Sequence, residues 1–398
     1  MSLLSATTKN DVGNRRATLN LVAGALWYVP GSFGMARLLG PQYSLRCLVF
    51  HDISDTESSF TKGLGVTIAR RYFEAALKFI TKHYSPVSLR DVIADFDGHG
   101  LPPRPVLVTF DDAYRSVREF AAPVCSNYGV PAVFFVNAAC LDNRRLALEN
   151  ILCHVANLFG MNTINAAIRS VDSAGELTVR SLTEVFSHFL PGTSLAGRAA
   201  FRRALLELAR ISEIDLAAEA GLYLSRQQLR DLANFNFEIG NHTYSHANCR
   251  CLSAADFAEE IDKNKAMLEA TSSTKVKSFS VPYGSSADLT PDLVAHLQHS
   301  GYEAVFLAEG RANSSPTHRS RLDRVSIRGS VDAAFFSEIE ILPRLRAMRN
   351  SLFGAANVEP SVSERENLRE PGAHALPRSV CESVPMSGGK SQGVENNA

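Results

Sequence analysis

Six short runs rich in β-branched and aromatic residues constrain the fold of this chain most strongly. They lie at residues 47–51, 106–110, 132–136, 237–240, 277–281 and 303–307. Several of them are almost continuously apolar instead of alternating with polar residues. This pattern is typical of strands buried on both faces, as in a parallel sheet covered by helices.

The segments between these runs have helical patterning. Ser253 is a suitable N-cap, and Phe257, Ile261 and Leu268 follow it at helical spacing. Residues 72–84 and 114–128 behave in the same way. Alternating strands and helices predict an α/β fold, with a distorted or incomplete (β/α) barrel as its closed form. In such barrels the chemistry lies at the carboxyl ends of the strands.

The alternation is interrupted at residues 142–222, which are rich in Leu, Ala and Arg. We interpret this segment as a helical insertion at the edge of a catalytic domain that spans residues 45–345. Residues 1–44 form a leader with one short amphipathic element. The tail at 355–398 has too few large apolar groups to bury a core, so we expect it to be disordered.

Composition limits the classes of partner and the location. Lys plus Arg equals Asp plus Glu at 41 each, which argues against a nucleic-acid-binding protein. Seven cysteines, an odd number without framework spacing, favour a reducing compartment. We therefore expect a cytoplasmic protein, with peripheral membrane contact through residues 19–28 as an alternative. The oligomeric state is left open.

The first candidate motif is Thr-Phe-Asp-Asp at residues 109–112, directly after a strand. Adjacent carboxylates repel each other, so one should resist ionisation unless a cation is present. With a metal, one Asp can ligate and the other can act as a base. The alternative is that the pair caps a helix starting near Ala113.

The second motif is His-Thr-Tyr-Ser-His at residues 242–246, after the strand that ends at Gly240. Two His four residues apart on a helical turn point the same way and can hold one ion. We expect Gly240 to form a tight turn that brings them beside the Asp pair. Two His and one carboxylate predict a catalytic metal site, although such a pair is often a plain surface or core feature.

The third motif is Ser-Val-Pro-Tyr-Gly at residues 280–284. Pro282 and Gly284 favour a sharp turn. The backbone N–H of Tyr283 could then face the reaction centre and stabilise an oxyanion. A simple turn without a role in catalysis is the alternative.

These motifs, in this order, resemble the polysaccharide deacetylase family, which has the NodB-homology domain and is also called carbohydrate esterase family 4. The resemblance runs from about residue 48 to about 327, apart from the insertion. It implies a metal-dependent hydrolase that removes N-acetyl or similar N-acyl groups from a carbohydrate. It makes Asp111 the catalytic base, and Asp112, His242 and His246 the metal ligands. The ion would be Zn²⁺, with Co²⁺, Ni²⁺ or Fe²⁺ as alternatives.

The chain departs from the family pattern at two positions. Many members carry an Arg at the place of Ser280, where it orients the base. Many also have a Leu-x-His motif near the C-terminus that supplies the general acid. Here His51 ends the first strand instead, which resembles a permuted branch that includes poly-N-acetylglucosamine deacetylases. We therefore expect His51 to be the general acid, oriented by Asp52 or Asp323, with a buried structural His as the alternative.

Two other functions compete with this interpretation. The chain could be a catalytically silent carbohydrate-binding relative, because the orienting Arg is missing. Alternatively, Cys249 and Cys251 could join His242 and His246 in a structural zinc site. The sequence identifies neither the sugar nor the acyl group, and a polymeric or a lipid-linked saccharide would both fit. The insertion could form a wall or lid over the substrate.

Overall fold

The computed structural model describes residues 43–172, 177–235, 237–311, 313, 319, 321–327 and 339–340. The expected tail at 355–398 lies outside the described residues. So does the expected leader, apart from Tyr43 and Ser44. The proposed domain boundaries therefore stay predictions.

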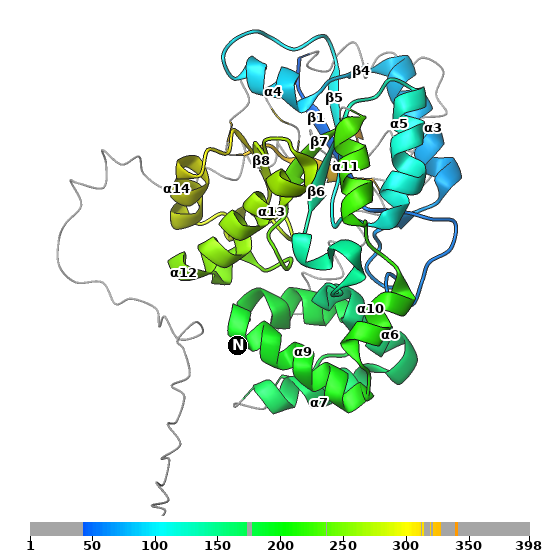
Figure 1. The fold of residues 1–398 in the computed structure, drawn as a ribbon, viewed down its shortest axis with the longest axis vertical. Coiled ribbons are helices and arrows are strands. Elements are labelled where there is room, and N and C mark those ends of the chain that lie inside the picture. The colour runs from blue at the N-terminus through cyan, green and yellow to red at the C-terminus, as the bar shows by residue number, and fades with distance from the viewer. Residues whose placement is uncertain are drawn as a thin grey trace, which may run out of the picture.

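A sheet of parallel strands forms the centre of the molecule (Figure 1). In spatial order the strands are β10 (Arg324–Ser326), β1 (Arg46–Phe50), β5 (Pro105–Phe110), β6 (Ala132–Val136), β7 (Glu238–Asn241), β8 (Ser278–Ser280) and β9 (Ala304–Phe306). The short strand β4 (Ser85–Pro86) pairs with β5, and β2 (Asp52–Ile53) pairs with β3 (Thr67–Ile68). A parallel bridge from Phe306 to Leu322 joins β9 to the segment before β10. The sheet is thus a nearly closed barrel, which confirms the predicted fold class.

All six predicted runs coincide with strands of this sheet. Strands β1, β5 and β6 are buried along their whole length, as their continuous apolar character predicts. Strand β10 was not predicted, because Arg324, Val325 and Ser326 lack the apolar run that identified the others.

Helices cover the outside of the barrel: α3 (Arg70–His83), α4 (Leu89–Asp95), α5 (Ala122–Asn127), α11 (Arg226–Asn234), α12 (Ala254–Phe257), α13 (Lys263–Ser272) and α14 (Pro291–His299). Short 3₁₀ and π turns are η1 (Val117–Ala121), η2 (Ala138–Asn143), η3 (Val185–Phe189), η4 (Leu190–Gly192), η5 (Cys249–Cys251), η6 (Ala258–Asp262) and η7 (Ser286–Asp288). Ser253 caps α12 as predicted: its hydroxyl accepts from the Asp256 N–H, and the Asp256 carboxylate accepts from the Ser253 N–H. Among the described residues, no helix is both long and apolar enough to span a membrane.

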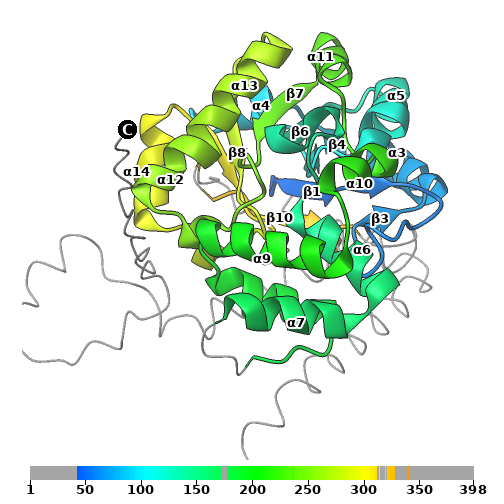
Figure 2. The ribbon, with the colours of Figure 1, turned by 60° about the horizontal axis from the view of Figure 1, so that its bottom comes forward.

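Between β6 and β7 the chain forms a separate group of helices. They are α6 (Leu148–Phe159), α7 (Met161–Val171), α8 (Leu182–Glu184), α9 (Leu195–Ala209) and α10 (Glu213–Ala220). They gather at one end of the barrel, in the lower part of Figure 1, and α9 passes in front of the strands in Figure 2. The residues expected to form the insertion thus lie at the end of the barrel where the site is.

The interior of the barrel is packed with aromatic side chains. Phe135 of β6 and Phe306 of β9 have ring centroids 5.2 Å apart, although β7 and β8 separate their strands in the sheet. Because two strands lie between β6 and β9 in the sheet, these rings can touch only across the interior of the barrel. Leu107 and Val133 belong to the same buried cluster. This cluster forms a floor below the carboxyl ends of the strands.

Candidate active site

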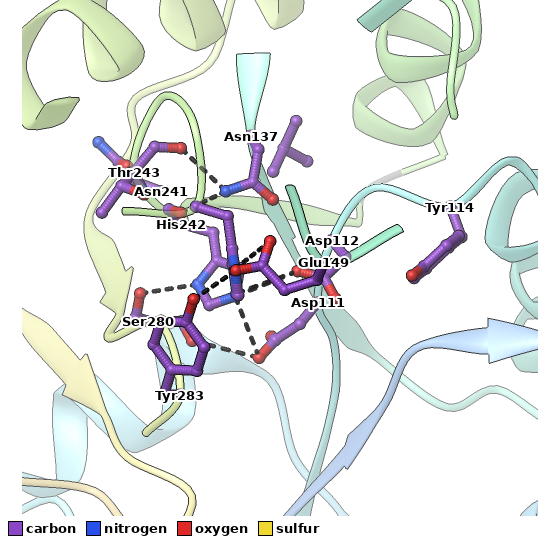
Figure 3. A network of polar contacts seen from close by, with 12 residues as sticks. Asp111, Asp112, Tyr114, Asn137, Glu149, Asn241, His242, Thr243, Ser280 and Tyr283 are labelled. Atoms are coloured by element: carbon purple, nitrogen blue, oxygen red, sulfur yellow. Dashed lines mark hydrogen bonds and ion pairs between the residues drawn. The ribbon is translucent and has the colours of Figure 1, made fainter. Parts of the chain in front are cut away.

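A cavity of about 320 Å³ opens at the carboxyl ends of the strands. Its lining contains all the residues predicted to serve the hydrolase reaction: His51, Asp111, Asp112, His242, His246 and Tyr283. Figure 3 shows the side chains of Asp111, Asp112, His242 and Tyr283 converging, with Tyr114 standing apart. The candidate residues of the three motifs and His51, which follows β1, therefore line one cavity.

Asp112, His242 and His246 form a cluster with ligand atoms within 4.8 Å of one another. The Asp112 Oδ1 lies 3.4 Å from the His242 Nε2 and 3.5 Å from the His246 Nε2. This Oδ1 is buried and has no hydrogen-bond partner among the described residues. A buried carboxylate oxygen in that state costs free energy unless a cation neutralises it. Together with two imidazoles, it fits a divalent transition metal.

The loop after β7 orients the two imidazoles. His242 and His246 were expected on a helical turn, and this expectation is wrong, because the segment after β7 is a loop. Thr243 and His246 adopt positive φ angles of 61° and 58°. These left-handed residues fold the loop back on itself and bring the two ring centroids to 5.0 Å. Such strain in non-glycine residues is common at functional sites.

Gly240 lies inside β7 and does not make the tight turn that we expected. A Cβ at this position would meet the Phe135 ring at 2.3 Å. Gly240 therefore lets the interior aromatic floor approach the strand that carries His242. The glycine is needed for close packing and not for backbone freedom.

Arg324 of β10 holds Asp111, a role that our sequence analysis did not predict. Its Nη1 and Nη2 donate to the two carboxylate oxygens of Asp111 at 2.7 and 2.8 Å. Burial alone would raise the pKa of Asp111, but the Arg324 guanidinium and the nearby histidines together outweigh this effect, so the pKa lies well below the usual range. Asp111 is therefore an ionised carboxylate in a fixed orientation.

Ser280, at the start of the third motif, contacts both Arg324 and Asp111. Arg324 Nη2 donates to the Ser280 Oγ at 2.7 Å, and the hydroxyl donates to Asp111 at 3.3 Å. The pKa of Asp112 is also lowered, since His246 and His242 outweigh the opposing effect of burial. We expected one of the two Asp to resist ionisation unless a cation is present. Arg324 is such a cation, and together with the histidines it compensates for the repulsion between the two carboxylates.

The Asp pair does not cap a helix, which excludes that alternative. The chain becomes helical only at Arg115, three residues after Asp112, and continues into η1. Asp112 and Ala113 have positive φ angles of 69° and 54°. This turn directs Asp112 into the cavity beside Asp111.

His51 follows β1 and lines the cavity with the metal-ligand candidates. Burial lowers its pKa, while the charges of Asp112 and Asp111 oppose this effect. The two carboxylates that we expected to orient His51 accept hydrogen bonds from other groups. Asp52 accepts from Thr67 and Ser116, and Asp323 Oδ1 accepts from the backbone of Glu309, Gly310 and Arg324. Among the described residues, no hydrogen bond joins either carboxylate to His51, and their role as orienters has no support.

Tyr283 sits in a strained turn. Its φ is 64°, and the Gly284 N–H donates to the Val281 carbonyl at 3.0 Å. A Cβ at Gly284 would lie 2.6 Å from the Ala308 backbone nitrogen, so the turn packs tightly against the strand end of β9. Among the hydrogen bonds of the described residues, none uses the Tyr283 N–H as donor. That group is therefore available to a ligand, as the oxyanion interpretation requires.

The helices between β6 and β7 add two residues that the sequence did not reveal. Glu149 of α6 lines the cavity, and Arg198 of α9 pairs with it at 2.8 Å. The Tyr283 hydroxyl contacts both of them. No local motif marks these positions, because the contacts join residues 49 to 134 positions apart.

The cysteines do not support a structural zinc site. Cys249 is buried, and the Cys251 Sγ donates to the Pro191 carbonyl at 3.2 Å. In the described part of the chain, the cluster with metal-ligand spacing contains Asp112, His242 and His246 and neither cysteine.

Comparisons with known proteins bear on the family and the fold of this chain. The family model of polysaccharide deacetylase matches residues 99–305. A deacetylase from Streptococcus pyogenes, PplD, solved in complex with acetate, superposes with a TM-score of 0.50 at 13% identity, over 75% of this chain and 99% of that one. IcaB from Ammonifex degensii aligns with a TM-score of 0.44 at 19% identity, over 71% of this chain and 91% of that one.

One curated protein, YlxY of Bacillus subtilis, is 33% identical over 72 residues. That stretch is 18% of this chain and 23% of YlxY, so the chain matches less than a quarter of that relative's length. The family match, in contrast, extends over more than half of the chain and contains the second and third strand-end motifs as well as the Asp pair. The chain belongs to the polysaccharide deacetylase family.

Proposed function

We propose that this protein is a metal-dependent hydrolase that removes N-acetyl or similar N-acyl groups from a carbohydrate. The observation that carries the proposal is the pairing of two different carboxylates. Asp111 is held ionised by Arg324, and the adjacent Asp112 faces two imidazoles with an unpartnered oxygen. A purely binding protein has no need of a fixed base beside a metal site.

Each candidate residue has a separate role in the proposed reaction. Asp112, His242 and His246 would hold the cation, which would supply Lewis-acid activation of the amide carbonyl and of water. Asp111 accepts a proton from the water, whose oxygen bonds to the acyl carbon. The Tyr283 N–H donates to the oxygen that becomes negative. His51 gives a proton to the nitrogen as the C–N bond breaks, which leaves a carboxylic acid and a free amine.

Zn²⁺ is the ion that best suits two imidazoles and one carboxylate with open positions. Co²⁺, Ni²⁺ and Fe²⁺ accept the same ligands, so we propose zinc as the first choice among these. The protein location that we propose is the cytoplasm. Five buried free thiols, Cys47, Cys125, Cys140, Cys153 and Cys249, fit a reducing compartment.

The substrate that we propose is an N-acylated sugar, free or at the end of a polymeric or lipid-linked saccharide. The apolar part of the cavity lining includes Leu64, Val66 and Phe186. Phe186 comes from the helices between β6 and β7, so that segment would form one wall for the sugar. An aromatic wall beside polar groups is common in pockets that bind small molecules.

The test measures metal content and acetate release from N-acetylglucosamine oligomers for wild type, Asp111→Asn and His242→Ala. We expect wild type to hold one metal and to release acetate. Asp111→Asn should keep the metal and lose turnover, whereas His242→Ala should lose both. Folded wild-type protein that binds no metal would refute the proposal.

A silent carbohydrate-binding relative is the second candidate. Its motivation was the missing arginine at Ser280, and Arg324 now provides an equivalent contact to Asp111. The same experiment separates the two. Wild type that holds metal, binds N-acylated sugars and releases no acetate from any of them would favour the silent relative.

A further inference from the structure

Glu149 reaches from α6 to the far side of the metal-ligand candidate His246. Its Oε2 lies 3.4 Å from the His246 Nδ1, and the side chain is buried. Both atoms are shielded from solvent and have no hydrogen-bond partner among the described residues. A buried donor and a buried acceptor that face each other at this distance need only a small adjustment to form a hydrogen bond.

A set of fixed contacts holds Glu149 in this position. Arg198 Nη2 donates to the Oε1 at 2.8 Å, and the Tyr283 hydroxyl also donates to the Oε1. Arg198 Nη1 donates to the Tyr283 hydroxyl at 2.9 Å, and Nη2 reaches the His246 carbonyl at 3.2 Å. These contacts occupy the Oε1 and leave the Oε2 for the imidazole.

His242 has a matching arrangement with a different partner. Its Nδ1 lies 2.8 Å from the Ser280 carbonyl, which can only accept, so the Nδ1 carries the proton and the Nε2 faces Asp112. In His246 the Nε2 also faces Asp112, and Glu149 is the acceptor on the other side of the ring. In each imidazole, the Nδ1 thus faces an acceptor of the protein and the Nε2 faces Asp112.

We propose, on the basis of the function proposed above, that Glu149 is a positioning residue that fixes the tautomer and orientation of His246 as a metal ligand. Arg198 keeps Glu149 in place, so the helices between β6 and β7 are part of the metal site as well as a wall of the cavity. Partners of this kind around metal-bound histidines typically change metal affinity by about 10- to 100-fold. Glu149 is not itself grouped with the ligand atoms of the cluster.

The alternative is that Glu149 and Arg198 form an ion pair with a purely structural role. The same helices contain a suitable control for this. Arg202 of α9 pairs with Glu213 of α10 through its Nε at 2.9 Å, and neither residue lines the cavity. If burial of an ion pair were all that mattered, removal of either acid would have the same effect on metal binding.

The experiment compares wild type with Glu149→Ala, Glu149→Gln and Glu213→Ala. The zinc dissociation constant is measured by competition with a chromophoric chelator. We expect Glu149→Ala to weaken zinc binding by about 10- to 100-fold, and Glu149→Gln, which keeps one acceptor oxygen, by less. Glu213→Ala should bind zinc as wild type does. Equal affinities of Glu149→Ala and wild type, or equal losses in Glu149→Ala and Glu213→Ala, would overturn the proposal.

A second measurement needs no variant to fold. Long-range ¹H–¹⁵N NMR spectra of metal-free wild type at a pH where the ring is neutral report which nitrogen of His246 carries the proton. We expect the Nδ1–H form, and an Nε2–H form would contradict the proposal. Neither readout depends on turnover. If wild type releases acetate but Glu149→Ala binds zinc as tightly as wild type does, only this inference is refuted. If Glu149→Ala binds zinc more weakly but wild type releases no acetate, only the hydrolase function is refuted.

Discussion

Arg324 joins the interior of the barrel to the carboxylate that we propose as the base. Its guanidinium carbon lies 5.3 Å from the Phe135 ring centroid and 5.8 Å from that of Phe306. The same group forms the two-point contact with Asp111. The side chain is 1% exposed, so contacts with the protein and not with water must compensate for the burial of its charge. The aromatic floor and the base are thus held by one residue.

At the residue scale, we predict that Arg324→Met lowers kcat by about 100-fold or more while metal content is retained, since base catalysis typically contributes 10²- to 10⁴-fold. The ligands Asp112, His242 and His246 do not contact the guanidinium in the described structure. Steady-state kinetics and metal analysis on the folded variant provide the check. Arg118→Met, which breaks the partly exposed pair with Asp231, is the control and should keep full activity.

Arg324→Met also removes one partner of a buried ion pair, which commonly costs about 3–5 kcal/mol of unfolding free energy. Urea denaturation should therefore show a large loss of stability in this variant and less than about 1 kcal/mol in Arg118→Met. Wild-type turnover in a folded Arg324→Met protein would show that Asp111 needs no cationic partner.

At the scale of elements, strands were easier to predict than the contacts between them. Strands β5 and β6 have continuous apolar runs, because the interior of the barrel and the outer helices bury both of their faces. Strand β10 has three residues and carries Arg324 in its inward position, so no apolar pattern identified it. The loop that brings His242 and His246 together depends on left-handed residues, which residue spacing does not reveal.

The metal-ligand candidates were found because each follows a strand whose carboxyl end could be predicted. Glu149 and Arg198 were not found, because their role depends on how α6 and α9 pack against the barrel. In the sequence they are ordinary charged residues of amphipathic helices. Only the three-dimensional contact with His246 and Tyr283 distinguishes them.

Strand β7 provides a prediction about packing. Gly240→Ala places a methyl group within 2.4 Å of two Phe135 ring carbons, so the strand or the ring must move. We expect a loss of about 1–3 kcal/mol in unfolding free energy. Thermal or urea denaturation measures this loss of unfolding free energy. The double variant Gly240→Ala, Phe135→Leu should lose less than the sum of the two single changes, and simple additivity would argue against the clash.

The wall formed by Phe186 leads to a prediction about substrate binding. Phe186→Ala should raise KM for an N-acetylated sugar several-fold with little change in kcat, because the ring lines the cavity without belonging to the reacting groups. Phe189→Ala is a suitable comparison, since Phe189 packs against Phe201 in the same helices and is not part of the lining. A large fall in kcat with unchanged KM in Phe186→Ala would contradict this role.

For the molecule as a whole, the proposed metal site depends on three regions that are far apart in the sequence. The loop after β5 supplies Asp112, the loop after β7 supplies His242 and His246, and α6 supplies Glu149. A ligand that binds only this assembled arrangement stabilises the folded state of the whole protein by mass action. Metal binding and global stability are therefore linked.

From this linkage we predict that zinc at 100 times its dissociation constant stabilises the protein by about 2.7 kcal/mol relative to the chelator-treated form. Differential scanning calorimetry at several zinc concentrations measures the corresponding rise in Tm. His242→Ala should show no such rise. An equal rise in His242→Ala would place the bound zinc somewhere other than this cluster.

The position of β10 in the sequence has a consequence for synthesis of the protein. Asp111, Asp112, His242 and His246 all leave the ribosome before Arg324, which lies 78 residues after His246 in the chain. A nascent chain therefore contains all three metal-ligand candidates while Asp111 still lacks the guanidinium that holds it. Under the proposed function, chains released before β10 is made would lack the contact that orients the base, and activity would require translation as far as β10.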